Sequence, residues 1–258
     1  MARQPEGPPP PPVVQRLRVR YAKRGPLRFT SHRDFARAFE RALRRADIPM
    51  AYSAGFSPHP KISYAGAAPT GVASEAEYLE IGLARACEPE AVRAGLDAAL
   101  PAGLDIVEVV EAEPPGLADR LEVSHWQIVL PAVALAEAAA AAEALLAAES
   151  VKVERATKDG TRTVDARAVI LSLGVVEPDD APDCAILDVV MRHATPAVRP
   201  DDVLTALRRV SGLSTPVTPR VTRLAQGLLD GGSPAGPGGH PRLIDPFCRD
   251  AGQTTSPR

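Results

Sequence analysis

The sequence contains no asparagine, only four lysines and only three cysteines among its 258 residues. Because 26 arginines accompany so few lysines, the composition indicates a GC-rich genome, and the arginine content alone says little about function. Cys87, Cys184 and Cys248 are far apart and odd in number, which excludes a disulfide framework and a CxxC metal pair. We therefore interpret Cys87 and Cys184 as buried or incidental thiols.

Long apolar runs are also absent from the sequence. No stretch of about 18 apolar residues lacks charge, so we expect neither a transmembrane helix nor a membrane partner. The N-terminal residues include no apolar core of a secretory signal, and we expect a cytoplasmic location by default. The P-loop, a GxGxxG turn after a strand, GxSxG and HExxH are all missing, so none of these motifs assigns a function.

Charge is unevenly distributed, although the net charge is only −2. Residues 15–64 hold 12 lysines and arginines against three acidic residues, a local excess of +9, so the rest of the chain carries −11. The overall composition, 45% hydrophobic and 24% charged, is ordinary for a soluble globular protein. A basic segment within a slightly acidic chain predicts an anionic partner for one face of the fold.

Proline and glycine mark the ends and the middle of the chain. Residues 1–13 are proline-rich and residues 231–258 are rich in glycine and proline, so we expect both to be disordered tails. A Glu-Pro-Pro-Gly run at 113–116 predicts a boundary between a basic domain at 14–113 and a second domain at 117–230.

Hydrophobic periodicity predicts one order of elements in the first half. Alternating residues indicate strands, and an apolar stripe indicates a first helix that Ser31 and Asp34 begin with a capping pattern. The predicted elements are a strand at 15–23, a helix at 31–46, strands at 61–67 and 76–84, a helix at 89–100 and a strand at 104–112. This β-α-β-β-α-β order is that of a ferredoxin-like unit.

The second half repeats this order with one added strand. The predicted elements are a strand at 121–130, a helix at 132–149, strands at 151–157, 163–171 and 184–192, a helix at 200–210 and a strand at 220–228. A Lys-Asp-Gly turn at 158–160 joins the first two of the three middle strands as a hairpin. The predicted fold class is therefore α+β, with two ferredoxin-like halves built on antiparallel sheets, on the basis of element order alone.

The turn before the first predicted helix is the first candidate site. A helix N-terminus offers free backbone N–H groups and the positive end of the helix dipole, which favours anions. The alternative is that Thr30, Ser31 and Asp34 do no more than cap the helix. The candidate ligands at this turn are Arg28, Thr30, Ser31, His32 and Arg33.

A row of arginines continues along the same predicted helix. Arg33, Arg37, Arg41 and Arg44 recur at helical spacing opposite the apolar stripe. A row of cations facing phosphates is the electrostatic pattern of nucleic-acid binding. The alternative is a solvated helix face in an arginine-rich protein.

The loop after this helix holds the third candidate. Pro58 and Pro60 fix the backbone on both sides of His59, so this histidine lies on a stiffened segment beside Ser57 and Lys61. A stiffened histidine indicates a functional role, and a purely structural histidine is the alternative.

His32 and His59 are candidates for general acid–base catalysis, because imidazole titrates near neutral pH. Metal binding by the two histidines together with Asp34 is a weaker alternative, and we assign no metal site.

The predicted hairpin of the second half carries three further polar candidates. Arg162, Asp165 and Arg167 are positioned to contact a partner or only one another.

His125 and His193 lie in or beside predicted strands, and we interpret both as structural.

Three of these segments together resemble a known family. Residues 28–34 (RFTSHRD), 52–81 (YSAGFSPHPKISYAGAAPTGVASEAEYLEI) and 158–170 (KDGTRTVDARAVI) are similar to the radical-SAM-associated domain of unknown function, and the similarity spans about residues 14–228. The family more often has SHLD where this chain has SHRD, and VDIRP where this chain has VDARA. The second departure weakens a binding role for the hairpin.

The resemblance implies an association with a radical SAM protein. This chain lacks the cysteine triplet that holds the cluster, so it resembles the stand-alone partner type of the family. We therefore expect no cofactor in this chain, and we expect the iron–sulfur cluster and SAM in the partner. Actinobacterial relatives tend to be encoded near a ribonuclease of the E/G type, which fits work on RNA.

We predict an accessory protein that binds RNA or another phosphorylated substrate for a radical SAM partner. One alternative is a metal-independent RNA endonuclease, by analogy with paired ferredoxin-like RNA endonucleases of CRISPR systems. The other alternative is a protein-interaction scaffold. The candidate catalytic residues are His32 and His59. The candidate substrate or RNA contacts are Arg28, Thr30, Ser31, Arg33, Arg37, Arg41, Ser57 and Lys61.

Overall fold

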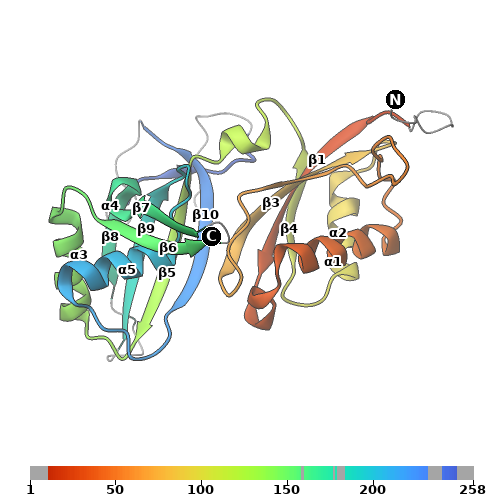
Figure 1. Cartoon of the computed structure of the whole chain (residues 1–258). Coiled ribbons are helices and arrows are strands. Elements are labelled where there is room, and N and C mark those ends of the chain that lie inside the picture. Colours follow the sequence, from red (N-terminus) through yellow and green to blue (C-terminus); the bar gives the residue numbers. More distant parts are fainter. Residues whose placement is uncertain (1–10, 158–159, 177, 179–183, 232–239, 249–258) are drawn as a thin grey trace. The chain divides into compact units, whose positions relative to one another are not determined.

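The computed structural model describes residues 11–157, 160–176, 178, 184–231 and 240–248. The chain forms two compact units, Met1–Arg120 and Leu121–Arg258. Each unit combines helices with antiparallel strands (Figure 1), which confirms the predicted α+β class. Residues 1–10 of the predicted proline-rich tail lie outside the described residues. No helix in the described ranges is both long enough and apolar enough to cross a membrane.

The first unit contains all six predicted elements. They are β1 (Gln15–Lys23), α1 (His32–Arg45), β2 (Ile62–Ala65), β3 (Ala73–Leu83), α2 (Pro89–Ala99) and β4 (Ile106–Glu111), with short 3-10 helices η1 (Gly25–Phe29) and η2 (Leu117–Arg120). The strands lie in the order β4-β1-β3-β2, and every pairing is antiparallel. The prediction placed the start of β3 three residues too late and made β2 too long at both ends.

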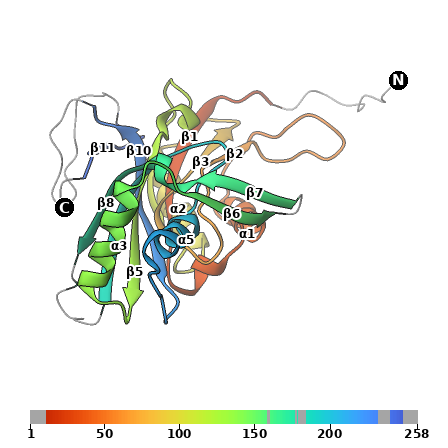
Figure 2. The same ribbon diagram turned by 60° about the vertical axis from the view of Figure 1, so that its left-hand side comes forward.

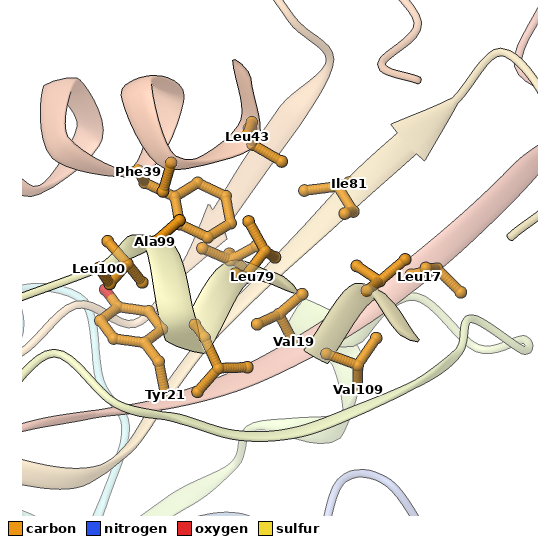
Figure 3. Packing of buried hydrophobic residues seen from close by; sticks show 14 of the residues in the cluster. Leu17, Val19, Tyr21, Phe39, Leu43, Leu79, Ile81, Ala99, Leu100 and Val109 are labelled. Atoms are coloured by element: carbon orange, nitrogen blue, oxygen red, sulfur yellow. The ribbon is translucent and has the colours of Figure 1, made fainter. Parts of the chain in front are cut away.

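Alternation along β1 decides which side chains enter the core of this unit. Leu17, Val19 and Tyr21 are buried on one face, where they meet both helices. Phe39 and Leu43 of α1 approach the same face, and Figure 3 shows these side chains packed together. Each fully buried leucine or phenylalanine stabilises the fold by roughly 1.5–3 kcal/mol.

The second unit contains the remaining elements. They are β5 (Val123–Pro131), α3 (Leu135–Ala147), β6 (Lys152–Thr157), β7 (Gly160–Asp165), α4 (Ala166–Val169), β8 (Ile170–Val176), β9 (Cys184–Arg192), α5 (Pro200–Ser211), β10 (Arg220–Leu229) and β11 (Leu243–Ile244). The main strands lie in the order β10-β5-β9-β8 with antiparallel pairings. Helices α3 and α5 pack side by side (Figure 2), and β6 and β7 form a separate hairpin.

One predicted strand of this unit is wrong. The alternation at 163–171 predicts a single strand, whereas β7 ends at Asp165 and the short helix α4 separates it from β8. The cause is the Asp165 carboxylate, which accepts hydrogen bonds from the backbone N–H groups of Arg167 and Ala168. This side chain therefore caps a helical turn and breaks the strand. Positions 158 and 159 of the predicted hairpin turn lie outside the described residues.

Asp165 also fixes the segment that precedes the hairpin. Its carboxylate accepts hydrogen bonds from the Ser150 hydroxyl at 2.7 Å and from the Val151 N–H at 3.1 Å. Burial alone would raise the pKa of Asp165, but the hydrogen bonds from Ser150 and three backbone N–H groups outweigh burial and lower this pKa. The ionised carboxylate is therefore the form that the folded state stabilises.

The C-terminal segment contributes one further strand. β11 pairs with the end of β10, at Leu228 and Leu229. Its residues lie inside the 231–258 stretch for which the composition predicts disorder, while 232–239 and 249–258 lie outside the described residues.

We predict that Asp165→Ala lowers the free energy of unfolding by about 2 kcal/mol, because it removes a helix cap and two further hydrogen bonds. Urea unfolding at pH 7 measures this change. A lowered folded-state pKa gives stability that is present above the ordinary carboxyl pKa of about 4 and is lost as pH falls through the folded pKa. Asp165→Asn should therefore lose that part of the acid dependence.

Glu149→Ala provides the matched control, since it removes an exposed carboxylate nearby. We expect its free energy of unfolding to stay within about 0.5 kcal/mol of wild type. Equal losses in Asp165→Ala and Glu149→Ala would contradict the capping role of Asp165.

Candidate functional site

The turn before α1 is organised by its own side chains. The Asp34 N–H donates a hydrogen bond to Ser31 Oγ at 3.2 Å, and the Ser31 hydroxyl donates to the Asp34 carboxylate at 2.6 Å. Ser31 is therefore the N-cap of α1, which confirms the predicted capping pattern. The Thr30 N–H donates to the Leu27 carbonyl at 2.9 Å, and this bond closes η1 immediately before the cap.

His32 is the first residue of α1 and is held by an aromatic contact. Its exposed ring meets the ring of Tyr64 edge to face, with centroids 4.7 Å apart. The Tyr64 hydroxyl is buried and has no hydrogen-bond partner among the described residues. Burial, together with the nearby charge of Glu40, raises the pKa of Tyr64 to about 12, so this phenol stays neutral at physiological pH.

The loop that carries His59 is closed by backbone hydrogen bonds. The Ser53 N–H donates to the His59 carbonyl at 2.9 Å, and the His59 N–H donates back to Ser53 Oγ at 3.0 Å. The Lys61 N–H donates to the Ala51 carbonyl at 2.8 Å. The side chains of Ser57, His59 and Lys61 are exposed. The stiffness predicted for this loop therefore has a second source besides its prolines.

The base of this loop lies beside the second half of α1. Tyr52 and Pro60 pair with each other and line a small pocket with Glu40 and Arg44 of the helix. His32 opens the first turn of the same helix, and Arg44 lies 12 positions further along it, a rise of about 18 Å. The structure therefore places His32 and the base of the His59 loop along different parts of α1, and a shared acid–base site stays a prediction.

The arginine row forms a distinct exposed face of α1, which we call the arginine face and define as Arg33, Arg37, Arg41 and Arg44. All four side chains are exposed. At 100° per residue they fall within an arc of about 80°, opposite the buried Phe35, Phe39 and Leu43. Among the described residues, none of the four guanidinium groups makes a hydrogen bond or an ion pair.

Four other arginines of the first unit have partners within the fold, and three of them pair with carboxylates. Arg18 on β1 is buried and faces Glu80, and Arg20 binds Glu108 at 2.8 Å. Arg24 forms ion pairs with the carboxylates of Glu75 and Asp105, of which Glu75 is the larger cause of the raised pKa of Arg24. The Arg45 guanidinium donates to the Ala99 carbonyl at 2.9 Å.

The carboxylates that pair with Arg18, Arg20 and Arg24 lie outside residues 15–64. The local excess of +9 therefore overstates the basic surface, because β3 and β4 supply carboxylates that face β1. Among the cations in residues 15–64 that have no carboxylate partner in the described chain, four lie together on the arginine face. Arg28, in the turn before α1, is engaged differently: its guanidinium carbon lies 4.7 Å from the ring centre of Phe29.

The polar residues of the predicted hairpin serve the second unit's own backbone. Asp165 caps α4, and the Arg167 guanidinium donates to the carbonyls of Leu146 and Ile170. These bonds favour the structural interpretation of the VDAR sequence. Arg162 is exposed on β7.

Two histidines of the second unit share one carboxylate, an arrangement that sequence reasoning missed. His125 Nε2 lies 2.6 Å from Asp188 Oδ1, and His240 Nε2 lies 3.2 Å from the same oxygen. Ser172 Oγ hydrogen-bonds to His240 Nδ1 at 2.8 Å. These residues come from β5, β8, β9 and the C-terminal segment, so no local pattern indicates their meeting. Within the described ranges, no three histidine, cysteine or acidic side chains are arranged to hold a metal ion.

A serine–histidine pair also occurs in this unit. Ser124 Oγ lies 2.6 Å from His193 Nε2, and His193 Nδ1 lies 2.9 Å from the Leu121 carbonyl oxygen. Ser124 is only 1% exposed, so its hydroxyl is not accessible to a substrate. The pair therefore joins the start of β5 to the residue that follows β9, and the structural role of His193 stays a prediction.

The sequence comparisons identify a family. Residues 16–200 match the family described as "Uncharacterized protein conserved in bacteria (DUF2344)", and the chain belongs to this family. No curated protein matches the chain. The family description does not mention radical SAM chemistry or RNA, so both associations stay predictions.

We predict that Ser31→Ala lowers the free energy of unfolding by about 1 kcal/mol, because the first turn of α1 loses its cap. Thermal or urea unfolding measures this loss. Ser57→Ala removes an equivalent hydroxyl from an exposed loop and should change stability by less than about 0.5 kcal/mol. A Ser31→Ala variant as stable as Ser57→Ala would show that the cap contributes nothing.

Proposed function

We propose that the first unit binds RNA or another phosphorylated substrate through the arginine face of α1. The observation that carries this proposal is that four exposed guanidinium groups on one helix have no partner within the described chain. Like charges at i,i+4 spacing destabilise an isolated helix by about 0.2–0.5 kcal/mol per pair. Folding alone therefore gives no reason to gather these arginines, whereas an anionic ligand does.

Further polar and basic side chains occur in the two segments that adjoin α1. Arg28, Thr30 and Ser31 precede the helix, and Ser57 and Lys61 project from the loop whose base lies beside its second half. We propose that these side chains contribute further phosphate or base contacts. Ser31 is already committed to capping, so its contribution is through the backbone N–H groups of the first turn.

The ferredoxin-like interpretation is part of the same proposal. The orders β4-β1-β3-β2 and β10-β5-β9-β8 support it for the two units, with β6, β7 and α4 as an insertion in the second. Delivery of the substrate to a radical SAM partner, which would hold SAM and the iron–sulfur cluster, is supported by the motif resemblance alone. Cleavage of RNA and a protein-interaction scaffold are the alternative functions, and no described contact of His32 or His59 favours cleavage.

We predict that replacing Arg37 and Arg41 by alanine weakens RNA binding and flattens its salt dependence. Each phosphate neutralised contributes about −0.7 to the slope of log K against log[salt] for a single strand, so the double variant should reduce the slope by about 1.4. Fluorescence anisotropy with a labelled single-stranded RNA across a salt series measures this slope. Stability should stay nearly unchanged, because exposed charges contribute little to folding.

A matched control removes the same charge from the second unit. Arg162 and Arg208 are exposed, and their double alanine variant should retain the wild-type slope. Equal slopes in wild type and the Arg37/Arg41 variant, with both proteins folded, would overturn the arginine face as the binding surface.

A further inference from the structure

The most exposed aromatic side chains of the described chain belong to the two segments that adjoin α1, the turn before it and the loop after it. Phe56 is 72% exposed, Phe29 is 59% exposed and Tyr52 is 37% exposed. Most other described aromatic side chains are buried in the cores of the two units, as Phe35, Phe39 and Trp126 are. Scattered exposed apolar residues are normal on protein surfaces. Here Phe29 immediately precedes the capped start of α1, and Tyr52 lies beside Arg44 at the base of the loop that carries Phe56.

Phe29 forms a supported flat surface before the N-terminus of α1. One edge of its ring lies over Gly71, where an added Cβ would be 3.7 Å from the ring. The Gly71 N–H donates a hydrogen bond to the Arg28 carbonyl at 2.8 Å, which ties η1 to the loop before β3. The Arg28 guanidinium lies 4.7 Å from the ring centre, so a cation and a π-face are presented together.

Phe56 lies at the tip of the closed loop, whose base lies beside Arg44 at the other end of the arginine face. The preceding Gly55 has φ +135°, a conformation that a side chain would strain, and open space surrounds it. The base of this loop is fixed by the pairing of Tyr52 with Pro60, and both line the pocket beside Arg44. The Phe56 ring is therefore exposed to solvent on a loop whose base is fixed.

We infer that the ligand of the arginine face is a single-stranded polynucleotide whose bases stack on Phe29 and Phe56. This inference rests on the proposed function and specifies its substrate class. Proteins that bind single strands combine a positive track for the phosphates with aromatic side chains on which bases stack. Bases in a duplex are stacked on one another and offer no free face to either ring. The unpaired arginines supply the charge complementarity, and the two phenyl rings supply the stacking surfaces.

The test compares three labelled ligands of equal length, about 12 nucleotides, by fluorescence anisotropy with the full chain. They are an oligo-uridine, an abasic strand with the same phosphates, and a duplex. Wild type should bind the oligo-uridine more tightly than either other ligand. Phe29→Ala and Phe56→Ala should each weaken oligo-uridine binding by roughly 5- to 150-fold, the range that corresponds to the stacking of one base. Neither should change the salt slope.

Two substitutions at the exposed position 56 separate stacking from apolar contact. Phe56→Trp keeps a π-face and should retain the affinity for oligo-uridine, whereas Phe56→Leu keeps apolar area without a π-face and should lose it. Because the ring is exposed, both variants should unfold at the wild-type temperature, which circular dichroism checks.

Different results would contradict the stacking inference and the proposed function. Equal affinity for the abasic strand and oligo-uridine, with no effect at Phe29 or Phe56, would overturn the stacking inference while phosphate binding survives. A duplex that binds as tightly as the single strand would also overturn it. No binding of any of the three ligands, or equally effective competition by polyglutamate, would overturn the proposed function itself and favour an acidic protein partner.

Discussion

The packing of α1 onto the sheet of the first unit determines the character of its surface. Phe35, Phe39 and Leu43 occupy one side of the helix and are buried against β1 and β3. With 3.6 residues per turn, burying this stripe turns Arg37 and Arg41 toward solvent. The same burial that stabilises the unit therefore presents a continuous row of cations, and any rotation of α1 would bury charge.

Arginines of the first unit differ in whether the fold supplies them with a carboxylate partner. Arginines on β1 face carboxylates of neighbouring strands, such as Glu80 and Glu108, and their charge is balanced by the fold. The arginine face has no such partner in the described chain. This contrast is stronger evidence for an anionic ligand than the number of arginines, which the arginine-rich composition of the whole chain already explains. It favours an external anion as the partner of α1.

The sequence predicted local features better than long-range ones. The bounds of β1, the helix that Ser31 caps and the apolar stripe of α1 follow from periodicity and capping, which are local. The break at Asp165 was missed because strand-like alternation continues through it, and only the hydrogen bonds of its carboxylate show the helical turn. The carboxylates that pair with β1 and the histidines around Asp188 come from distant segments, so their meeting depends on the tertiary fold.

The most direct test of the central claim is an NMR titration of the arginine side-chain Nε–H resonances of the full chain with single-stranded RNA. Single Arg→Lys variants assign the resonances of the arginine face. We predict that Arg33, Arg37, Arg41 and Arg44 shift on addition of RNA, while Arg24, which is held by two carboxylates, does not. Shifts confined to arginines of the second unit, or no shifts at concentrations where RNA is bound, would contradict the assignment of α1 as the binding surface.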